Sequence, residues 1–387
     1  MLRESDSISR RCFVGLAAGA IAGSAATVRA AAPPTAPVAI GKCPDYGTAL
    51  VPTLERMFDQ LGGLGGLVKG KTVAIKIDMV GGPADRFGYV ATEDSHWTHP
   101  RVIGAVVHLI GKAGAKRIRV VEGAWNTSDP LEENMLEANW EPRDILNAAP
   151  LVEFENTNWL GPAKKYSRLW VPSGGYMFKG FDMNHSYEDC DVFVSATKLK
   201  MHATAGVTLS IKNCFGTLPI TIYGDGAGID EPSVLPRAGR WFLHSGNRQP
   251  SRSAPSENNP GASRDAGYRI PRILVDIAAA RPIHLSVIEG IHALIGGEGP
   301  WNRPIKTGSP QLLVAGLNPV CTDAAAMAVM GFDPMATRGT APFERCDSTL
   351  ELAEKAGLGT RDLRQIDLRG LPIRESVFDY RKYLSGT

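Results

Sequence analysis

The residues with the clearest potential for chemistry lie close together between Asp191 and Gly216. Lysine ammonium groups bind carboxylates and phosphates, and histidine transfers protons near neutral pH because of its unperturbed pKa. Hydroxyl and amide side chains can orient a bound molecule. We therefore place an active site here, with His202, Lys200 and Lys198 as catalytic candidates. The substrate-binding candidates in the same stretch are Lys212, Asn213, Thr208 and Ser210.

The spacing of these residues indicates how they are presented. The apolar run Val192–Val194 predicts a buried strand that ends at Ser195. Lys198, Lys200 and His202 follow at a spacing of two, so in an extended chain their side chains project to the same side. The next residues form either a short helix or a second extended segment that returns to the same place. The alternative interpretation is a solvated basic loop beside a sheet.

The elements that position this stretch alternate between strands and helices. The pattern predicts a strand over Thr72–Met79, a helix over Pro100–Gly114 and a strand over Lys116–Glu122. Such a β-α-β unit pairs its strands in parallel, and open parallel sheets bind ligands at the carboxyl ends of their strands. We therefore predict an α/β fold with a mainly parallel central sheet, flanked by helices and carrying a long polar insertion.

Other candidate residues follow the predicted strands. Glu122 would act as a partner acid, and Lys76 would add positive charge for an anionic substrate. The backbone amides of Gly297 and Gly299 could bind an anion, because glycine allows close approach of the backbone. If the site holds a divalent metal, its candidate ligands are His202, Asp78 and Glu289.

Composition narrows the class of protein. The 387 residues are 43% hydrophobic and 21% charged, which is ordinary for a globular protein. The net charge of +2 shows no basic excess, so we expect no nucleic-acid binding. No dinucleotide fingerprint is evident. The cysteines include no CxxC-type pair, which argues against a cysteine-ligated cluster or a structural zinc site.

The N-terminus has the pattern of an export signal. Ser9-Arg10-Arg11-Cys12-Phe13-Val14 precedes an apolar run that reaches Ala26, and small residues surround Ala30. This pattern is typical of a twin-arginine signal cleaved near Ala30. The alternative is a membrane anchor, but the run is shorter than the roughly 20 residues that a spanning helix needs. We expect the twin-arginine machinery to export the protein to the periplasm or out of the cell, with no membrane span after cleavage.

The predicted organisation has three parts. Residues 1–30 form the signal peptide, and residues 31–45 form a flexible lead-in that is rich in Ala and Pro. Residues 46–387 form the α/β domain. Within it, residues 223–269 are polar and rich in Gly, Pro, Ser and Asn, which is typical of a lid or a disordered insertion.

Two adjoining motifs resemble the signature of the DUF362 family. Residues 197–202 read TKLKMH and residues 206–216 read GVTLSIKNCFG. Members of that family carry PKLKTH-like and GVTLGLKNLFG-like sequences in this order. The strand with Lys76 resembles their VLIKPNLV-like segment, although Asp78 stands where they have asparagine. The resemblance covers nearly all of the chain after the signal, and it implies no particular reaction because the family is named for an unknown function.

Three functions are compatible with these residues. The first is an enzyme acting on a small anionic metabolite at a Lys/His site. The second is a metal-dependent or iron–sulfur-associated redox protein, since some DUF362 relatives carry an added ferredoxin-like segment that this chain lacks. The third is a non-catalytic protein that captures a ligand beneath residues 223–269. The cofactor is unknown, and a divalent metal stays open.

Overall fold

The computed structural model describes residues 32–82, 85–125, 129–158, 166–229 and 239–384. The helices and strands considered below belong to the unit Pro33–Thr387. The predicted signal peptide, residues 1–30, lies outside the described residues.

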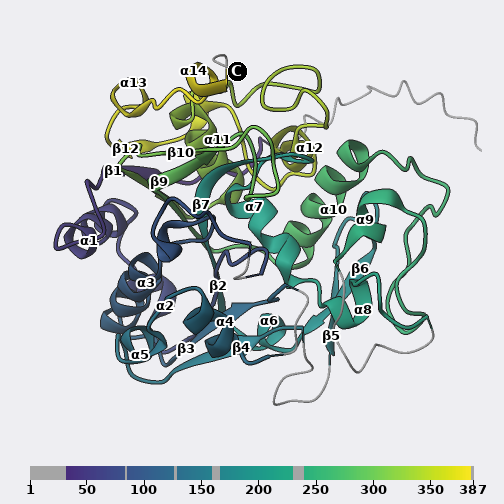
Figure 1. The fold of residues 1–387 in the computed structure, drawn as a ribbon, viewed down its shortest axis with the longest axis horizontal. Helices are drawn as coiled ribbons and strands as arrows, with labels where there is room; N and C mark the ends of the chain where they lie inside the picture. Colours follow the sequence, from purple (N-terminus) through teal and green to yellow (C-terminus); the bar gives the residue numbers. More distant parts are fainter. Residues whose placement is uncertain (1–31, 83–84, 126–128, 159–165, 230–238, 385–387) are drawn as a thin grey trace, which may run out of the picture. The chain divides into compact units, whose positions relative to one another are not determined.

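A mixed sheet with ten described strands forms the centre of this unit (Figure 1). Its main order is β12-β1-β11-β9-β7-β2-β3-β4, with β8 paired to β7 and β10 paired to β9. The strands from β9 to β4 run parallel, whereas β11 is antiparallel to both of its neighbours. The predicted α/β fold with a mainly parallel sheet is confirmed. The strands are β1 (Val38–Lys42), β2 (Thr72–Lys76), β3 (Arg117–Glu122), β4 (Val152–Asn156), β7 (Val192–His202), β8 (Gly206–Val207), β9 (Leu285–Ile295), β10 (Lys306–Gly308), β11 (Leu312–Gly316) and β12 (Leu368–Gly370).

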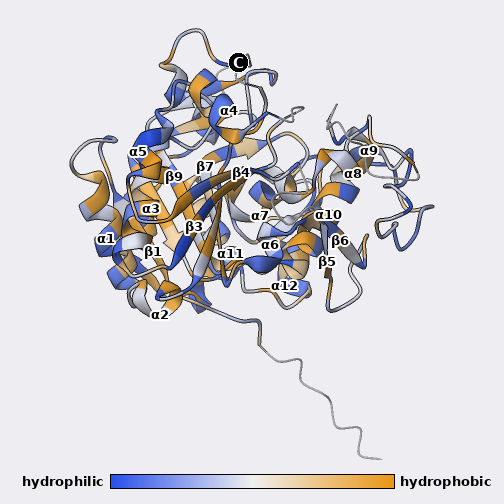
Figure 2. Cartoon of the chain, turned by 90° about the horizontal axis from the view of Figure 1, so that it is seen from below, coloured by the Kyte–Doolittle hydropathy of each residue, from blue (hydrophilic) through white to orange (hydrophobic). Residues whose placement is uncertain are grey.

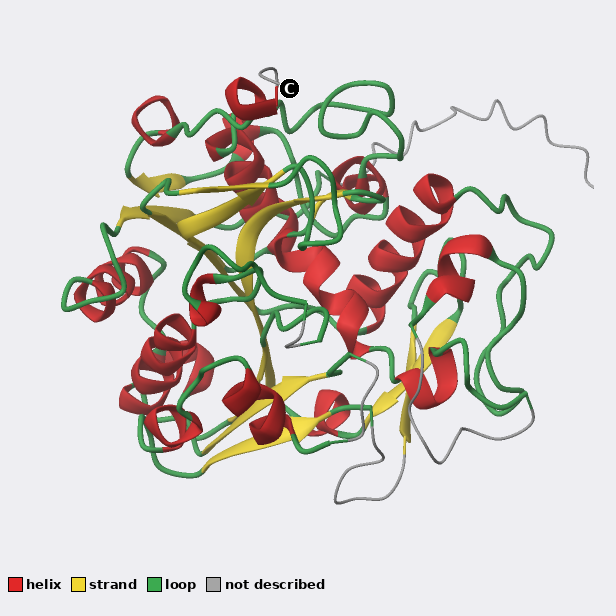
Figure 3. Cartoon of the chain, in the orientation of Figure 1, coloured by secondary structure: helices red, strands yellow, loops and turns green. Residues whose placement is uncertain are grey.

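Helices cover both faces of the sheet (Figure 3), and a separate hairpin joins β5 (Tyr166–Trp170) to β6 (Gly180–Asn184). Buried apolar residues form two clusters, one with α1, α3, α4 and α5 and the other with α7, α10, α11 and α12. Hydrophobic residues colour the central strands in Figure 2. The helices are α1 (Leu50–Gln60), α2 (Gly65–Val68), α3 (Pro100–Lys112), α4 (Leu131–Glu137), α5 (Pro142–Leu146), α6 (Ser186–Asp189), α7 (Leu209–Asn213), α8 (Ile220–Tyr223), α9 (Trp241–Ser245), α10 (Ala266–Ala280), α11 (Pro319–Val329), α12 (Thr349–Lys355), α13 (Ile373–Ser376) and α14 (Arg381–Leu384).

The predicted β-α-β unit is present as β2, α3 and β3. Pro100 occupies the first turn of α3, and the His99 side chain accepts a hydrogen bond from the Arg101 amide. The helix can begin there because proline needs no hydrogen-bond partner in the first turn. β2 and β3 then pair in parallel.

Among the described helices, none is both long and apolar enough to cross a bilayer.

The flexible lead-in predicted over residues 31–45 is wrong for its second half. Val38–Lys42 forms β1, which lies between β11 and β12 in the sheet. Val38, Ala39 and Ile40 are buried. The run VAIGK is short and follows an Ala/Pro-rich segment, so the sequence pattern does not indicate a strand. It forms one because β11 supplies its hydrogen-bond partners.

The strand predicted to end at Ser195 continues to His202. β9 pairs with this extension, and the register shifts between Lys198 and Lys200. Polar residues can continue a central strand if neighbouring elements supply partners for their charges. The sequence prediction failed because those partners come from distant parts of the chain.

The polar tract 223–269 is partly structured. It contains α9, and α10 begins within it at Ala266. Glu257 forms an ion pair with Arg269 of α10, and neither side chain is exposed. The described parts of the tract are therefore anchored to the domain. Residues 230–238 lie outside the described part of the chain.

Helix α7, which carries several predicted site residues, is held by a carboxylate from α11. The Asp323 oxygens accept the backbone amides of Ser210 at 2.9 Å and Ile211 at 3.0 Å. Leu209, the first residue of α7, has a φ of 27°, a conformation that non-glycine residues rarely adopt. Asp323 is buried, and this burial raises its pKa to about 7. It therefore fixes a strained connection between β7 and α7.

This anchor predicts a pH-dependent stability. Between pH 4 and 7 the Asp323 carboxyl is ionised in the unfolded chain and protonated in the folded one, so the free energy of unfolding falls as pH rises. The slope from this group is about 1.4 kcal/mol per pH unit. We expect Asp323→Asn to remove that part of the slope in urea unfolding at pH 5, 6 and 7. Equal slopes in both proteins would contradict the assignment.

Candidate active site

Three buried lysine–carboxylate pairs lie at the carboxyl ends of the parallel strands. We call them the ion-pair row. Strands β2, β3, β7 and β9 and the turn after β2 supply their side chains, none of which is more than 4% exposed. The pairs are Lys76–Glu122 at 2.7 Å, Lys200–Asp78 at 2.8 Å and Lys198–Glu289 at 2.8 Å.

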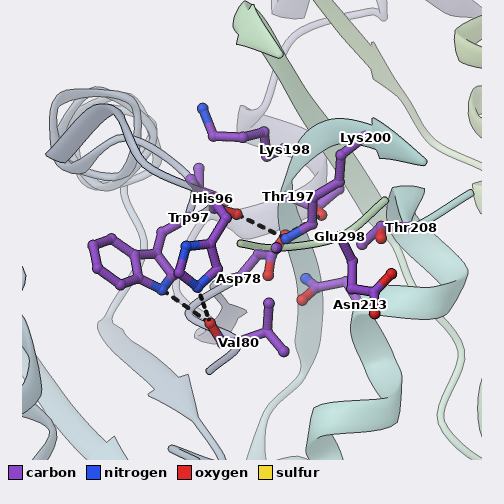
Figure 4. Close-up of polar contacts among 12 residues, drawn as sticks. Asp78, Val80, His96, Trp97, Thr197, Lys198, Lys200, Thr208, Asn213 and Glu298 are labelled. Carbon is purple, nitrogen blue, oxygen red and sulfur yellow. Dashed lines mark hydrogen bonds and ion pairs between the residues drawn. The ribbon is translucent and has the colours of Figure 1, made fainter. Parts of the chain in front are cut away.

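The lysines of this row have further partners within the protein. Lys76 Nζ also donates to the Ile77 carbonyl and to Asn213 Oδ1, at 2.6 and 3.1 Å. Lys200 Nζ donates to the His96 carbonyl at 2.8 Å (Figure 4). Lys198 Nζ donates to the His292 carbonyl at 3.0 Å. Buried ammonium groups need such partners to offset their lost hydration, so these three lysines act as internal counterions.

The carboxylates of the row are equally committed. Glu122 accepts the backbone amides of Met79 and Gly123, each at 2.8 Å. Glu289 accepts the Tyr46 hydroxyl at 2.6 Å. The Lys200 ammonium holds the pKa of the Asp78 carboxyl below its ordinary value, although burial opposes this. The charged groups of the row are therefore paired within the protein, and both oxygens of Glu122 already accept hydrogen bonds.

The predicted metal ligands do not form a common site. Asp78 and Glu289 bind different lysines of the row. His202 accepts a backbone hydrogen bond through Nδ1. No group of three or more His, Cys, Asp or Glu residues in the described part of the chain is arranged to hold a metal ion.

Several predicted substrate-binding residues connect β7 with α7. The Thr208 hydroxyl donates to the Met201 carbonyl at 3.4 Å. The Asn213 amide group donates to Ser195 Oγ at 3.0 Å and accepts from Lys76. Ser210 is buried, and its Oγ has no hydrogen-bond partner in the described structure. These side chains lie near the row but contact protein groups.

Gly297 and Gly299 shape a turn that presents Glu298. Asn302 Oδ1 accepts the amides of Glu298 and Gly299 at 2.9 and 3.1 Å. A Cβ atom at Gly297 would lie 2.3 Å from the Asn302 side chain, so only glycine fits. The Gly299 amide is thus already used, and the functional group of this turn is the Glu298 carboxylate.

Lys212 differs from the lysines of the ion-pair row. Its ammonium group makes no hydrogen bond or ion pair with any described residue, and it lies 4.7 Å from the ring centroid of Phe215. Burial lowers the pKa of Lys212 to about 8, against the attraction of Glu298. Lys212 is therefore the lysine whose donors are available to a ligand.

Lys212 belongs to what we call the lysine–histidine cluster, formed by Lys212, His202, His244 and Glu298. Glu298 Oε2 lies 4.0 Å from His202 Nδ1, and Glu298 accepts the Trp301 indole N–H at 2.9 Å. Burial raises the pKa of Glu298, but His202, these hydrogen bonds and Lys212 together lower it to about 2. The Lys212 charge in turn lowers the pKa values of both histidines.

The two histidines of the cluster have opposite tautomers. His202 Nδ1 accepts the Thr204 amide at 3.1 Å, so its neutral ring carries the proton on Nε2. His244 Nδ1 lies 3.0 Å from the Arg240 carbonyl, which can only accept, so its Nε2 holds a lone pair. Burial lowers the pKa of His202 to about 3 and that of His244 to about 4. The cluster thus offers one neutral donor and one neutral acceptor.

Asp225 positions His244, the histidine whose Nε2 can accept a proton. Its carboxylate accepts the amides of Trp241 and Phe242 at 2.9 and 2.7 Å, which caps α9. The ring of His244, on that helix, contacts Phe215 edge-on with centroids 5.5 Å apart. His244 is not among the site residues predicted from the sequence, because the polar sequence around it carries no motif.

Arg240 adds a second cation beside Phe215. Its guanidinium carbon lies 6.0 Å from the ring centroid, and its Nε donates to the Leu218 carbonyl at 2.6 Å. Arg240 is buried, and burial lowers its pKa to about 10. Among the described residues it has no carboxylate within ion-pair distance. Two cations that lack ion-pair partners among the described residues therefore lie beside Phe215.

The cluster reaches open space at His202. This residue lines a cavity of about 320 Å³ with Met201, Ala203, Gly296, Pro342, Glu344, Arg345 and Cys346. A cavity of about 610 Å³ lies elsewhere, beside α1, α3 and α5, and none of the cluster residues lines it. We base the site on the cluster because it contains Lys212 and two titratable histidines and lies close to Arg240, the second cation beside Phe215.

The fold and the cluster define an α/β protein with a cationic site at the carboxyl edge of a parallel sheet. Residues 73–328, about two-thirds of the chain, match the domain of unknown function DUF362. The chain therefore belongs to the DUF362 family. A thylakoid-associated protein of Synechocystis sp. is 25% identical over 298 residues, covering 77% of this chain and 75% of the relative.

Two solved structures show weaker similarity. The lactate racemase apoprotein of Thermoanaerobacterium thermosaccharolyticum is 13% identical, with a TM-score of 0.35 over 71% of this chain and 54% of its own. A protein of Thermotoga maritima is 12% identical, with a TM-score of 0.30 over 70% of this chain and 56% of its own. The chain spans little more than half the length of each.

The structural role of the ion-pair row predicts the effect of breaking one pair. Lys200→Met leaves the buried Asp78 carboxylate without its main counterion, so we expect the free energy of unfolding to fall by about 3–5 kcal/mol. Replacing both partners, Lys200→Met with Asp78→Leu, should recover much of that loss. Urea unfolding measures both, with the exposed Lys116→Met as control. If Lys200→Met were as stable as the unmodified protein, the row would not be structural.

Proposed function

We propose that this protein is an enzyme that acts on a small anionic molecule bound at the lysine–histidine cluster. The observation that carries this proposal is the pair of cations on Phe215. Lys212 and Arg240 have no ion-pair partner in the described structure, whereas every lysine of the ion-pair row has one. A desolvated cation without a counterion is costly, and an anionic ligand offsets that cost.

The two histidines support an enzyme over a protein that only binds. The His202 Nε2–H can donate a hydrogen bond to an oxygen that gains negative charge, and neutral imidazole serves well as such a donor. The His244 Nε2 lone pair can accept a proton. Anion binding alone requires neither group. Their opposite tautomers suit a reaction in which a proton moves while charge develops on a neighbouring oxygen.

The ion-pair row would contribute indirectly. It holds β7 in the sheet as far as His202 and holds Asn213 beside Lys76. Lys198, Lys200, Lys76 and Glu122 then position the cluster without touching the ligand. Of the lysines predicted to bind or act on the substrate, Lys212 is therefore the one that would bind the anion.

We also propose that the protein is exported by the twin-arginine machinery to the periplasm or the cell exterior. The support is the N-terminal pattern around Arg10 and Arg11. N-terminal sequencing of protein from the exported fraction should find a chain that starts near Ala31. Replacing both arginines by lysine should retain the chain inside the cell. Export of that variant at the normal rate would contradict the proposal.

Anion binding predicts a specific loss on removing the Lys212 ammonium. We expect isothermal titration with phosphate, sulfate and pyruvate to detect binding of at least one anion. Lys212→Ala should weaken that binding about tenfold or more, because a charge-assisted hydrogen bond contributes about 1.5–3 kcal/mol. The matched control is Lys116→Ala, which removes an exposed lysine. Equal affinity in Lys212→Ala and the unmodified protein would contradict the proposed site.

A further inference from the structure

The Lys212 amine is placed as a nucleophile as well as a cation. The lysines of the ion-pair row donate to two or three oxygens each, so their N–H groups are used within the protein. Lys212 makes no such bond with the described residues, and its Nζ lies 4.7 Å from the centroid of the Phe215 ring. A lysine in an apolar setting beside another cation can lose its proton and attack an electrophilic carbon.

The neighbours of Lys212 supply what attack on a carbonyl needs. The buried guanidinium of Arg240 uses Nε on the Leu218 carbonyl, and Nη2 makes a long contact of 3.5 Å with Asn158. Its remaining N–H groups can hold a carboxylate. The His202 Nε2–H can bind the carbonyl oxygen, and the His244 lone pair can accept the proton that the amine releases.

We propose that Lys212 forms an imine with the carbonyl carbon of a small 2-oxo acid whose carboxylate binds Arg240. This inference rests on the proposed function, since it needs an anion at the cluster. His202, which would bind the carbonyl oxygen, also lines the cavity of about 320 Å³. The lowered pKa of Lys212, about 8, supports the step because a useful fraction of the amine is then unprotonated near neutral pH.

The step balances without a further reactant. His244 takes a proton from the Lys212 ammonium, and the nitrogen lone pair forms a bond to the carbonyl carbon. The π electrons of the carbonyl move to its oxygen, which the His202 N–H stabilises and which then receives the proton from His244. A second proton from the nitrogen, carried by His244, lets this oxygen leave as water while the carbon–nitrogen double bond forms. The products are a protonated imine and one water molecule.

Borohydride trapping tests this inference. The purified protein is incubated with pyruvate or glyoxylate, reduced with sodium borohydride and digested, and the peptides are weighed by mass spectrometry. We expect the reduced adduct on the peptide that contains Lys212. Lys212→Arg, which keeps the positive charge, should lose the adduct while still binding pyruvate in titration. His244→Gln should slow trapping at least tenfold, and Lys116→Arg should leave it unchanged.

The outcomes separate this inference from the proposed function. If pyruvate binds and Lys212→Ala weakens its binding but no adduct forms, the imine is overturned and the anion site stands. An adduct that persists in Lys212→Arg also overturns the imine at this residue. If neither pyruvate nor phosphate nor sulfate binds, the proposed function fails, and this inference fails with it.

Discussion

The structure depends on the pairing of buried charge at the carboxyl ends of its parallel strands. Three lysines and three carboxylates lie there with almost no exposure, and each lysine has a carboxylate within 2.8 Å. An unpaired charge at such a position would cost several kcal/mol. The requirement explains local details. At Gly216, for example, a Cβ atom would lie 2.9 Å from both Lys76 Nζ and Glu122 Oε1.

Two cations of the structure do not follow this rule of charge pairing. Lys212 and Arg240 lie against Phe215 without a carboxylate at ion-pair distance in the described structure. His244, whose Nε2 can accept a proton, contacts the same ring, and His202, whose Nε2 can donate, lies 4.0 Å from Glu298. The paired charges of the ion-pair row stabilise the fold. The unpaired charges of Lys212 and Arg240 indicate where an anionic ligand would bind. Helix α7 carries Lys212 and helix α9 carries His244, and the side chains of Asp323 and Asp225 fix these two helices.

Much of the fold could be predicted from periodicity, because β2, α3 and β3 bury regular apolar faces. The stretch around Lys212 could be found from its density of charged residues. The sequence could not show which lysines lack a partner, because the partners lie far away in the chain. Lys198, for example, pairs with Glu289, which is 91 positions away. The predicted end of the strand at Ser195 failed for the same reason. The tautomers of His202 and His244 follow from contacts with Thr204 and Arg240, and no sequence pattern shows them.

The central claim is that Lys212 is the available amine of this sheet edge. NMR titration of the protein with isotopically labelled lysine side chains tests it most directly, with Lys212→Arg used to assign the resonance. The account predicts that a lysine titrates near pH 8 and that its signal disappears in Lys212→Arg. A Lys212 resonance that titrates at its ordinary value of 10.5 would contradict the account, because the amine would then be solvated like a surface lysine.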